Sequence, residues 1–285
     1  MVDIFIIIVA LVVLAIASLN DIRTREVPDW LSYGLIFTGL AIGTLKSIAT
    51  LKYTFILYSA FGFAVFFAIA CLMYYTGQWG GGDSKLLMGL GALIGLRFEY
   101  SIQFMFMFLF NLLVVGAIYG FAWSITLALK NRQSFRKSYL SMLKDSKVAK
   151  MRSLVITISI SFLILFIVSL FVFNTFTAIP LLMISMLAFL FFYLFIFSKS
   201  VENSCMVKPY PVSKLTEGDW IANDVIIKGK HICGPKDLGI SKKQILILQK
   251  LKLKSVLVKE GIPFVPSFFF AFIATWLIGN WFLLL

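Results

Sequence analysis

Long apolar stretches separated by short polar segments constrain this chain more than any other feature. A membrane-spanning helix needs about 20 apolar residues. Hydrophobic residues make up 60% of the 285 residues and charged residues only 14%, whereas a soluble domain carries about 25% charged residues. We therefore predict an all-α polytopic membrane protein with about eight transmembrane helices. The predicted spans are 4–19, 30–48, 54–75, 86–96, 102–129, 154–173, 178–197 and 266–285.

The spans and the polar segments divide the chain into five parts. Residues 1–129 are predicted to form a membrane core of about five spans, 130–152 a basic loop, 153–198 a transmembrane hairpin, and 263–285 the last helix. Between them, residues 199–262 are predicted to form a small cytoplasmic α+β unit. Its pattern indicates an edge strand at 206–212, a hairpin turning at Gly229, a helix from Ser241 to Leu253 and a strand at 255–259.

The basic charge predicts how the chain is oriented. The net charge is +13, which in a membrane protein indicates cytoplasmic loops facing anionic lipid rather than nucleic acid. Residues 130–152 hold eight basic residues and one acid, Asp145, so the positive-inside rule places them in the cytoplasm. Counting spans from there puts Asp21, Asp83 and residues 198–263 in the cytoplasm and both termini outside. Membrane lipids are expected partners and nucleic acid is not.

Metal and cofactor binding are not expected. The three cysteines form no CxxC pair, and His231 is the single histidine. Structural zinc sites need clustered cysteine and histidine ligands. His231 is therefore interpreted as a turn or surface residue.

Two acidic residues stand at the ends of predicted spans. Asp21 closes the first span, and Asp83 follows Gly80, Gly81 and Gly82 just before the fourth. A carboxylate at the bilayer centre costs roughly 2.5–3.5 kcal/mol, so an acid near the membrane is a functional candidate. Each segment alone is also typical of a polar turn, with Asp83 as a helix N-cap. Glycine, however, leaves the backbone open to an approaching peptide, and two carboxylates on one face indicate an aspartyl protease.

The two segments together resemble a known family. Asp21 with Pro28 seven residues later, and Gly80-x-Gly82-Asp83 followed by Lys85-Leu86, resemble the prepilin peptidases. The similarity is to their archaeal branch, the prepilin and preflagellin (prearchaellin) peptidases, which are GxGD-type membrane aspartyl proteases. It is strongest over residues 14–96. Residues 260–267 more weakly resemble that branch's entry to its last helix.

The resemblance implies the activity, its residues and its substrates. Asp21 and Asp83 would be the catalytic pair, with Gly80 and Gly82 as motif glycines and Gly81 in the variable position. The substrates would be pilin, archaellin or similar precursors, with a short basic leader before a hydrophobic helix, cut at the cytoplasmic membrane face. Bacterial members that also methylate carry a four-cysteine segment that this chain lacks, so we predict a protease without methyltransferase activity.

The expected mechanism uses a shared proton. Two close carboxylates do not both ionise, so one activates a water and the other protonates the scissile carbonyl. Asp83 starts a helix, where the dipole favours a carboxylate, and Asp21 ends one. This placement predicts Asp83 as the base and Asp21 as the acid.

Four neighbouring residues are candidates for supporting roles. Glu26 and Asp29 lie in the loop that would meet a basic leader, although they equally suit solvated acids balancing Arg23 and Arg25. Pro28 is predicted to start the second helix. Lys85 is predicted to hold Asp83 or a phosphate, or to extend towards the membrane surface.

Three other functions fit parts of the pattern. A presenilin-like or signal-peptide-peptidase-like protease shares GxGD, but it has a Tyr-Asp pair where Asn20 precedes Asp21 here, and it has a Pro-Ala-Leu motif that this sequence lacks. A proton-coupled transporter would use two acids as proton sites, but it usually shows inverted repeats. A non-catalytic scaffold of a pilus or archaellum assembly machine would not need the acid pair.

Overall fold

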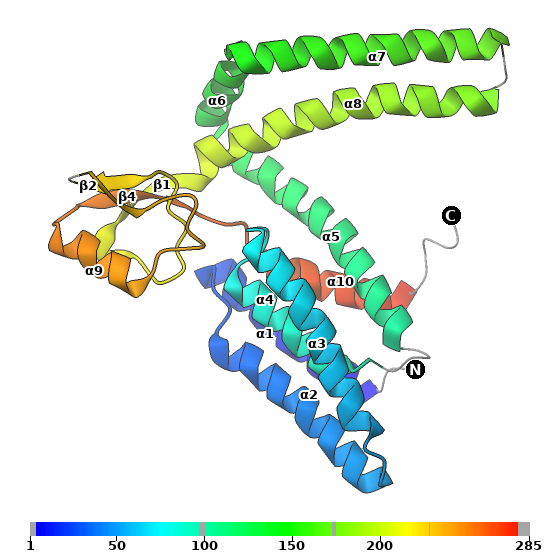
Figure 1. The fold of residues 1–285 in the computed structure, drawn as a ribbon, viewed down its shortest axis with the longest axis vertical. Coiled ribbons are helices and arrows are strands. Elements are labelled where there is room, and N and C mark those ends of the chain that lie inside the picture. The colour runs from blue at the N-terminus through cyan, green and yellow to red at the C-terminus, as the bar shows by residue number, and fades with distance from the viewer. Residues whose placement is uncertain (1–3, 97–100, 173–174, 228, 279–285) are drawn as a thin grey trace. The chain divides into compact units, whose positions relative to one another are not determined.

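The computed structural model describes residues 4–96, 101–172, 175–227 and 229–278 and is almost entirely helical (Figure 1). Six of the described helices are long and apolar enough to cross a membrane, and this confirms the all-α polytopic membrane class. They are α1 (Ile4–Thr24), α2 (Asp29–Thr50), α3 (Thr54–Tyr75), α5 (Ser101–Lys130), α7 (Ser146–Val172) and α8 (Thr175–Val201).

Two shorter helices occupy the other two predicted spans. They are α4 (Gly81–Ile94) and α10 (Val265–Ile278). The rest of the last predicted span, 279–285, and residue 173 at the end of the sixth lie outside the described residues. The chain divides into two units. The first comprises residues 1–123, 236–241 and 261–285, and the second comprises residues 124–235 and 242–260.

In the first unit, the short helix α4 packs against both α2 and α3 (Figure 1). Nine of its 14 residues are buried. Small residues permit this close packing. A Cβ built at Gly39 of α2 would lie 2.5 Å from the carbonyl carbon of Ala92, and one built at Gly91 would lie 2.6 Å from Cβ of Phe66 on α3. The sequence therefore places glycine where helix backbones approach.

Helix α4 is short for a membrane-spanning helix. Fourteen residues extend about 21 Å at 1.5 Å per residue, against about 30 Å of hydrocarbon. Beyond its end, the Leu96 N–H donates to the carbonyl of Tyr58 at 2.8 Å. Tyr58 lies only one turn into α3. The segment from Gly80 to Leu96 therefore runs back along most of the length of α3.

The last helix, α10, packs against α1. An aromatic cluster accompanies this contact. The Trp79 ring centroid lies 6.0 Å from that of Phe264 and 5.3 Å from that of Phe268, and Phe108 of α5 lies 5.8 Å from Phe272. Trp79, Phe268 and Phe272 are buried. Helix α10 is therefore part of the same hydrophobic core as the first five helices.

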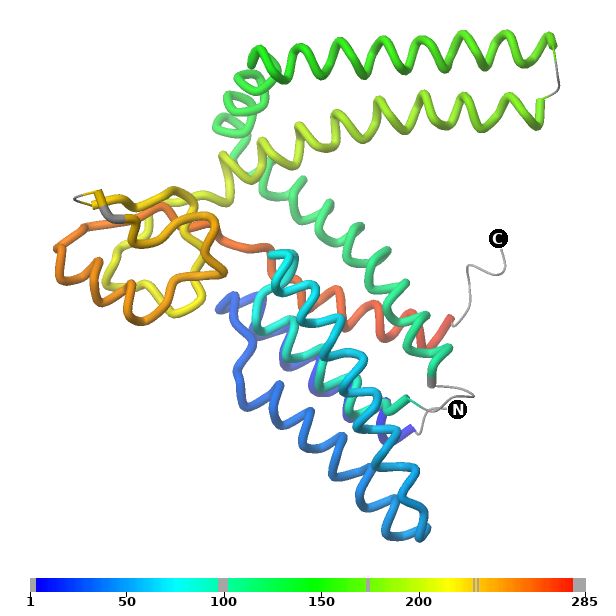
Figure 2. The backbone as a smooth tube through the Cα atoms, in the orientation of Figure 1, coloured from blue at the N-terminus to red at the C-terminus, as the bar shows by residue number. Residues whose placement is uncertain are grey.

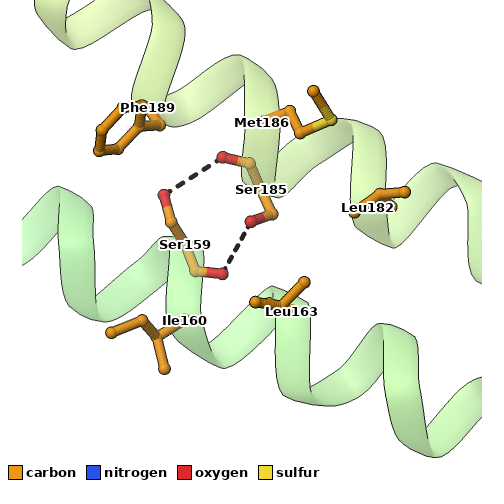
Figure 3. Close-up of a pocket in the computed structure, with 7 residues that line it drawn as sticks. All are labelled: Ser159, Ile160, Leu163, Leu182, Ser185, Met186 and Phe189. Atoms are coloured by element: carbon orange, nitrogen blue, oxygen red, sulfur yellow. Dashed lines mark hydrogen bonds between the residues drawn. The ribbon is translucent and has the colours of Figure 1, made fainter.

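In the second unit, α7 and α8 run side by side as an antiparallel pair (Figure 2). The Ser159 hydroxyl donates to the Ser185 carbonyl at 3.2 Å, and the Ser185 hydroxyl donates to the Ser159 carbonyl at 2.8 Å. Hydroxyl groups commonly join helices in this way within membranes. A pocket of about 270 Å³ lies beside the two serines, with an otherwise apolar lining (Figure 3). None of the predicted site residues lines it.

The basic segment predicted as a loop is largely helical. It contains α6 (Arg132–Lys144) and the start of α7. Apolar residues recur along α6, and Phe135 packs on Phe197 of α8 with ring centroids 5.4 Å apart. The charge of this segment identified a polar connection, but its spacing of apolar residues also specifies an amphipathic helix.

The small α+β region before the last helix is confirmed. A π-helical turn, η1 (Glu202–Met206), leads into β1 (Val207–Pro211) and the 3-10 turn η2 (Val212–Lys214). Strand β1 pairs antiparallel with β4 (Ser255–Lys259), and β2 (Val225–Ile227) with β3 (Lys230–Cys233). Helix α9 (Lys242–Lys250) is shorter than the predicted 241–253. It ends early because Lys252 turns left-handed, with φ of 53°.

Candidate active site

Asp21 lies three residues before the end of α1 and is buried, with 6% of its surface exposed. Its Oδ2 accepts a hydrogen bond of 2.9 Å from the backbone N–H of Val265. Val265 is the first residue of α10, and the first N–H groups of a helix have no partner within it. Asp21 therefore accepts a hydrogen bond from an otherwise unpaired N–H at the amino-terminal end of α10, where the helix dipole favours a negative charge.

Asp83 is the third residue of α4. It precedes the apolar part of that helix, which begins at Leu86, and it lies outside the six long spans. Its Oδ2 accepts a hydrogen bond of 3.1 Å from the N–H of Gly80. The pKa of Asp83 is raised to about 7, mainly by burial and to a smaller extent by the nearby carboxylate of Asp21. The two acids, 62 residues apart in sequence (83 − 21), are therefore close enough to repel each other.

The three glycines before Asp83 have different environments. Gly81 and Gly82 belong to the first turn of α4, whereas Gly80 is extended, with φ of −72° and ψ of 167°. A Cβ at Gly82 would lie 3.0 Å from Cβ of Val27, but one at Gly81 would meet nothing nearer than Tyr74 at 3.9 Å. Gly82 therefore permits close packing of the α1–α2 connection. Only Gly80 has the extended backbone that pairing with a peptide strand requires.

Lys85 and Asp29 form an ion pair that the sequence interpretation missed. Lys85 Nζ lies 2.6 Å from Asp29 Oδ1 and 5.3 Å from the centroid of the Tyr33 ring. The side chains of Lys85 and Asp29 are 33% and 65% exposed, so the pair contributes little to stability. It nevertheless joins the first turn of α4 to that of α2. The sequence predicts that Lys85 holds Asp83 or a phosphate or extends towards the membrane surface, and that Asp29 either meets a leader or is a solvated acid balancing the nearby arginines. The sequence offered one indication of this ion pair, because both residues lie near the start of a predicted helix.

The other predicted loop residues lie at the same end of α1 and α2. Glu26 is exposed, and Pro28 immediately precedes α2 with φ of −58°, which suits a helix entry. Arg23 is exposed in the last turn of α1. The segment that follows Asp21 therefore carries exposed charged side chains of both signs.

The contacts of Arg25, which lies beside Asp21, were not predicted from the sequence. Arg25 has a left-handed backbone with φ of 61°. Its Nη1 donates to the carbonyl of Gly261 at 2.8 Å, and its Cζ lies 5.3 Å from the centroid of the Trp123 ring. Tyr119, one turn earlier on α5, is within electrostatic reach of Asp21 and Arg25. These contacts join residues about 100 and 236 positions apart (25 to 123 and 25 to 261), so no local pattern reveals them.

Metal ligands do not gather at this site. Among the described residues, no group of three or more His, Cys, Asp or Glu side chains is arranged to hold a metal ion. His231 lies in the small α+β region, where its Nε2 is 3.0 Å from Asp224 Oδ1. The groups described beside Asp21 are the Asp83 carboxylate, the Val265 N–H, the Arg25 guanidinium and the Tyr119 side chain.

Comparison with known proteins relates part of this chain to one peptidase family. Residues 8–121 match the type IV leader peptidase family. That range includes Asp21, the glycine run and Asp83, and it ends within α5. The family resemblance drawn from the motifs is confirmed over this part of the chain.

Individual relatives match a similar stretch. The chain is 40% identical over 81 residues to a preflagellin peptidase of Methanococcus maripaludis, which covers 28% of this chain and 35% of that protein. It is 41% identical over 86 residues to one of Methanococcus voltae, covering 30% and 36%. It is 38% identical over 87 residues to one of Methanocaldococcus jannaschii, covering 30% and 37%. The chain thus spans about a third of the length of these relatives. No solved structure matches.

Proposed function

We propose that this chain is a membrane aspartyl endopeptidase that removes the short basic leader of type IV pilin-like or archaellin precursors. The observation that carries the proposal is the approach of two carboxylates, the buried Asp21 and the partly buried Asp83, within the segment similar to leader peptidases. The named relatives are preflagellin peptidases. A precursor of that kind supplies a peptide bond at the membrane surface.

The mechanism uses the acid pair with one shared proton. One carboxylate takes a proton from water as the water attacks the scissile carbonyl, and the other donates a proton to the carbonyl oxygen. The tetrahedral intermediate then collapses, and the peptide nitrogen leaves with a proton from the dyad. No cofactor takes part, and methylation of the new amino terminus is not part of the proposal.

The two acids have different roles in this proposal. We assign Asp21 as the base, because it accepts the Val265 N–H at the start of α10 and has Arg25 nearby. We assign Asp83 as the acid, because burial keeps its proton to near neutral pH. This reverses the assignment made from helix position within the sequence, which took no account of α10.

The active site belongs to the cytoplasmic face in this proposal. The end of α1 and the starts of α2, α4 and α10 meet around the acid pair. The basic segment 130–152 orients the chain with its positive side inward. Both termini would then lie outside, and the α+β region would be cytoplasmic.

The proposal is tested with purified protein in lipid vesicles and a short-leader archaellin precursor. We expect one new amino terminus, detected by mass spectrometry directly after the basic leader and without an added methyl group. Cleavage should persist in a metal chelator. Loss of cleavage on chelation, or a cut within the hydrophobic helix, would contradict a leader peptidase of this type.

A further inference from the structure

The Arg25 side chain occupies a site built for a cation. Its guanidinium lies over the Trp123 ring and donates to the carbonyl of Gly261. An aromatic face and a carbonyl oxygen both attract positive charge. The carboxylate of Asp21 adds attraction, because Arg25 and Asp21 interact electrostatically. The three groups come from α5, the entry to α10 and α1, so they meet only in the folded chain.

Two polar atoms in the floor of this site lack partners. In the described part of the chain, neither the Tyr119 hydroxyl nor the Trp123 Nε1 makes a hydrogen bond, although both atoms are buried. Buried polar atoms are normally hydrogen-bonded, and each exception calls for an explanation. The rings of Tyr119 and Trp123 lie 5.9 Å apart on successive turns of α5. Both groups keep unused hydrogen-bonding capacity, which a substrate meets only after the side chains that cover them move.

Arg25 itself is held in an unusual way. It has φ of 61°, a conformation that a non-glycine residue adopts at a cost of about 1–3 kcal/mol. Its side chain is nevertheless exposed. Because the Arg25 side chain is exposed, it can leave the Trp123 ring without unpacking the buried core, and another cation can take its place.

We propose that Trp123, Tyr119 and the Gly261 carbonyl form a subsite for one basic side chain of the substrate, which Arg25 fills when no substrate is bound. This inference rests on the proposed function and specifies how that site selects its peptide. A leader lysine or arginine displaces the Arg25 side chain, takes its place over Trp123, and brings the following peptide bond towards Asp21. The exchange conserves charge beside the acid pair.

The test measures binding separately from cleavage. The probe is a fluorescent leader peptide that ends at the cleavage site, together with versions in which one basic residue at a time is norleucine. Binding to the full-length protein in detergent is compared among the wild type, Trp123→Leu and Trp123→Phe. We expect one norleucine replacement to weaken wild-type binding about tenfold, within the range of a cation–π contact. That replacement should have less than a twofold effect in Trp123→Leu and an intermediate effect in Trp123→Phe.

A second set of variants tests the internal occupant. Arg25→Ala should bind the basic leader several-fold more tightly than the wild type, because the competing cation is gone. Arg25→Lys should restore wild-type affinity, and Arg23→Ala, an exposed arginine two residues away, should behave as the wild type. A purely structural role for Arg25 predicts weaker binding in Arg25→Ala, and that result would overturn the subsite.

The subsite would also be overturned if each norleucine replacement weakened binding to Trp123→Phe by the same factor as binding to the wild type. This comparison does not depend on whether Trp123→Leu folds. The proposed function can fail separately from the subsite. In that case a full-length precursor binds through its leader but is not cut.

Discussion

At the residue scale, each carboxylate of the candidate site is held by a backbone N–H group. Asp21 accepts a backbone N–H from a helix that begins 244 residues later (265 − 21). Asp83 accepts one from its own turn and is raised in pKa by burial and by Asp21. The motifs predicted both residues because a carboxylate near a membrane is rare. Helix position in the sequence predicts Asp83 as the base and Asp21 as the acid, and the opposite assignment proposed above depends on the contact of Asp21 with Val265, which lies outside both motifs.

The pKa of Asp83 predicts the pH dependence of cleavage. Asp83 has a pKa of about 7, so it holds its proton below that pH and loses it above. An acid catalyst must be protonated, so we expect activity to fall as pH rises through about 7. Initial rates of precursor cleavage from pH 5 to 9, with protein stability followed in parallel, measure this. A rate that stays constant to pH 9 would exclude Asp83 as the proton donor.

Variants of the Lys85–Asp29 ion pair distinguish between two roles for Asp29. If the pair only positions α2 against α4, Lys85→Met and Asp29→Asn should each lower cleavage by a similar factor, about two- to fivefold, since exposed pairs contribute at most about 1 kcal/mol. The double variant should be no worse than either single one. If Asp29 instead recognises the leader, Lys85→Met should improve the apparent affinity for a basic leader while Asp29→Asn weakens it. Steady-state kinetics of the four proteins distinguish these results.

At the element scale, α4 and α10 position the site, and only one of them was readily predictable. Small residues recur along α2 and α4 in the sequence and are typical of close helix packing, and Gly39 of α2 and Gly91 of α4 do lie against neighbouring helices. Helix α10 was predicted as a span, but its contact with Asp21 depends on long-range packing that no local pattern encodes. The basic charge of 130–152 likewise hid α6, although the apolar spacing was present in the sequence.

The contact between α10 and Asp21 predicts the effect of removing one N–H group. Val265→Pro deletes the donor at a helix start, where proline is tolerated. We expect cleavage to fall about tenfold or more, because a hydrogen bond to a charged group contributes about 1.5–3 kcal/mol. Val265→Ala keeps the donor and serves as the control. Equal activity in the two folded variants would show that the bond does not support catalysis.

Packing of α4 on α2 predicts that the same substitution has different effects on the packed and the exposed face of α2. Gly39→Ala would place a Cβ 2.5 Å from the backbone of α4, whereas Gly34→Ala on the same helix meets nothing within 4 Å. Overpacking of this kind costs about 1–3 kcal/mol. Thermal unfolding in detergent should show a lower midpoint for Gly39→Ala, with reduced cleavage because Asp83 begins α4. Unchanged stability in Gly39→Ala would contradict the close packing.

At the scale of the whole molecule, the apolar pattern predicted the positions of the membrane helices. It did so because the bilayer requires long apolar helices whose backbone groups pair internally. The α+β region was also predictable from its strand and turn signals. The Arg25 contacts to Trp123 and Gly261 were not, because they join segments that only the complete fold brings together.

The central claim is that Asp21 and Asp83 act as one catalytic pair, and one experiment tests it directly. Cleavage of a short-leader precursor in membranes is compared for the wild type, Asp21→Asn, Asp83→Asn and the control Asp29→Asn, which removes a nearby exposed carboxylate. We expect both active-site variants to lose cleavage by at least about a thousandfold, since an amide neither accepts a proton from water nor donates one to the carbonyl oxygen. The control should lose no more than about fivefold, the loss expected when an exposed ion pair is removed. Substantial turnover by Asp21→Asn or by Asp83→Asn would contradict the dyad.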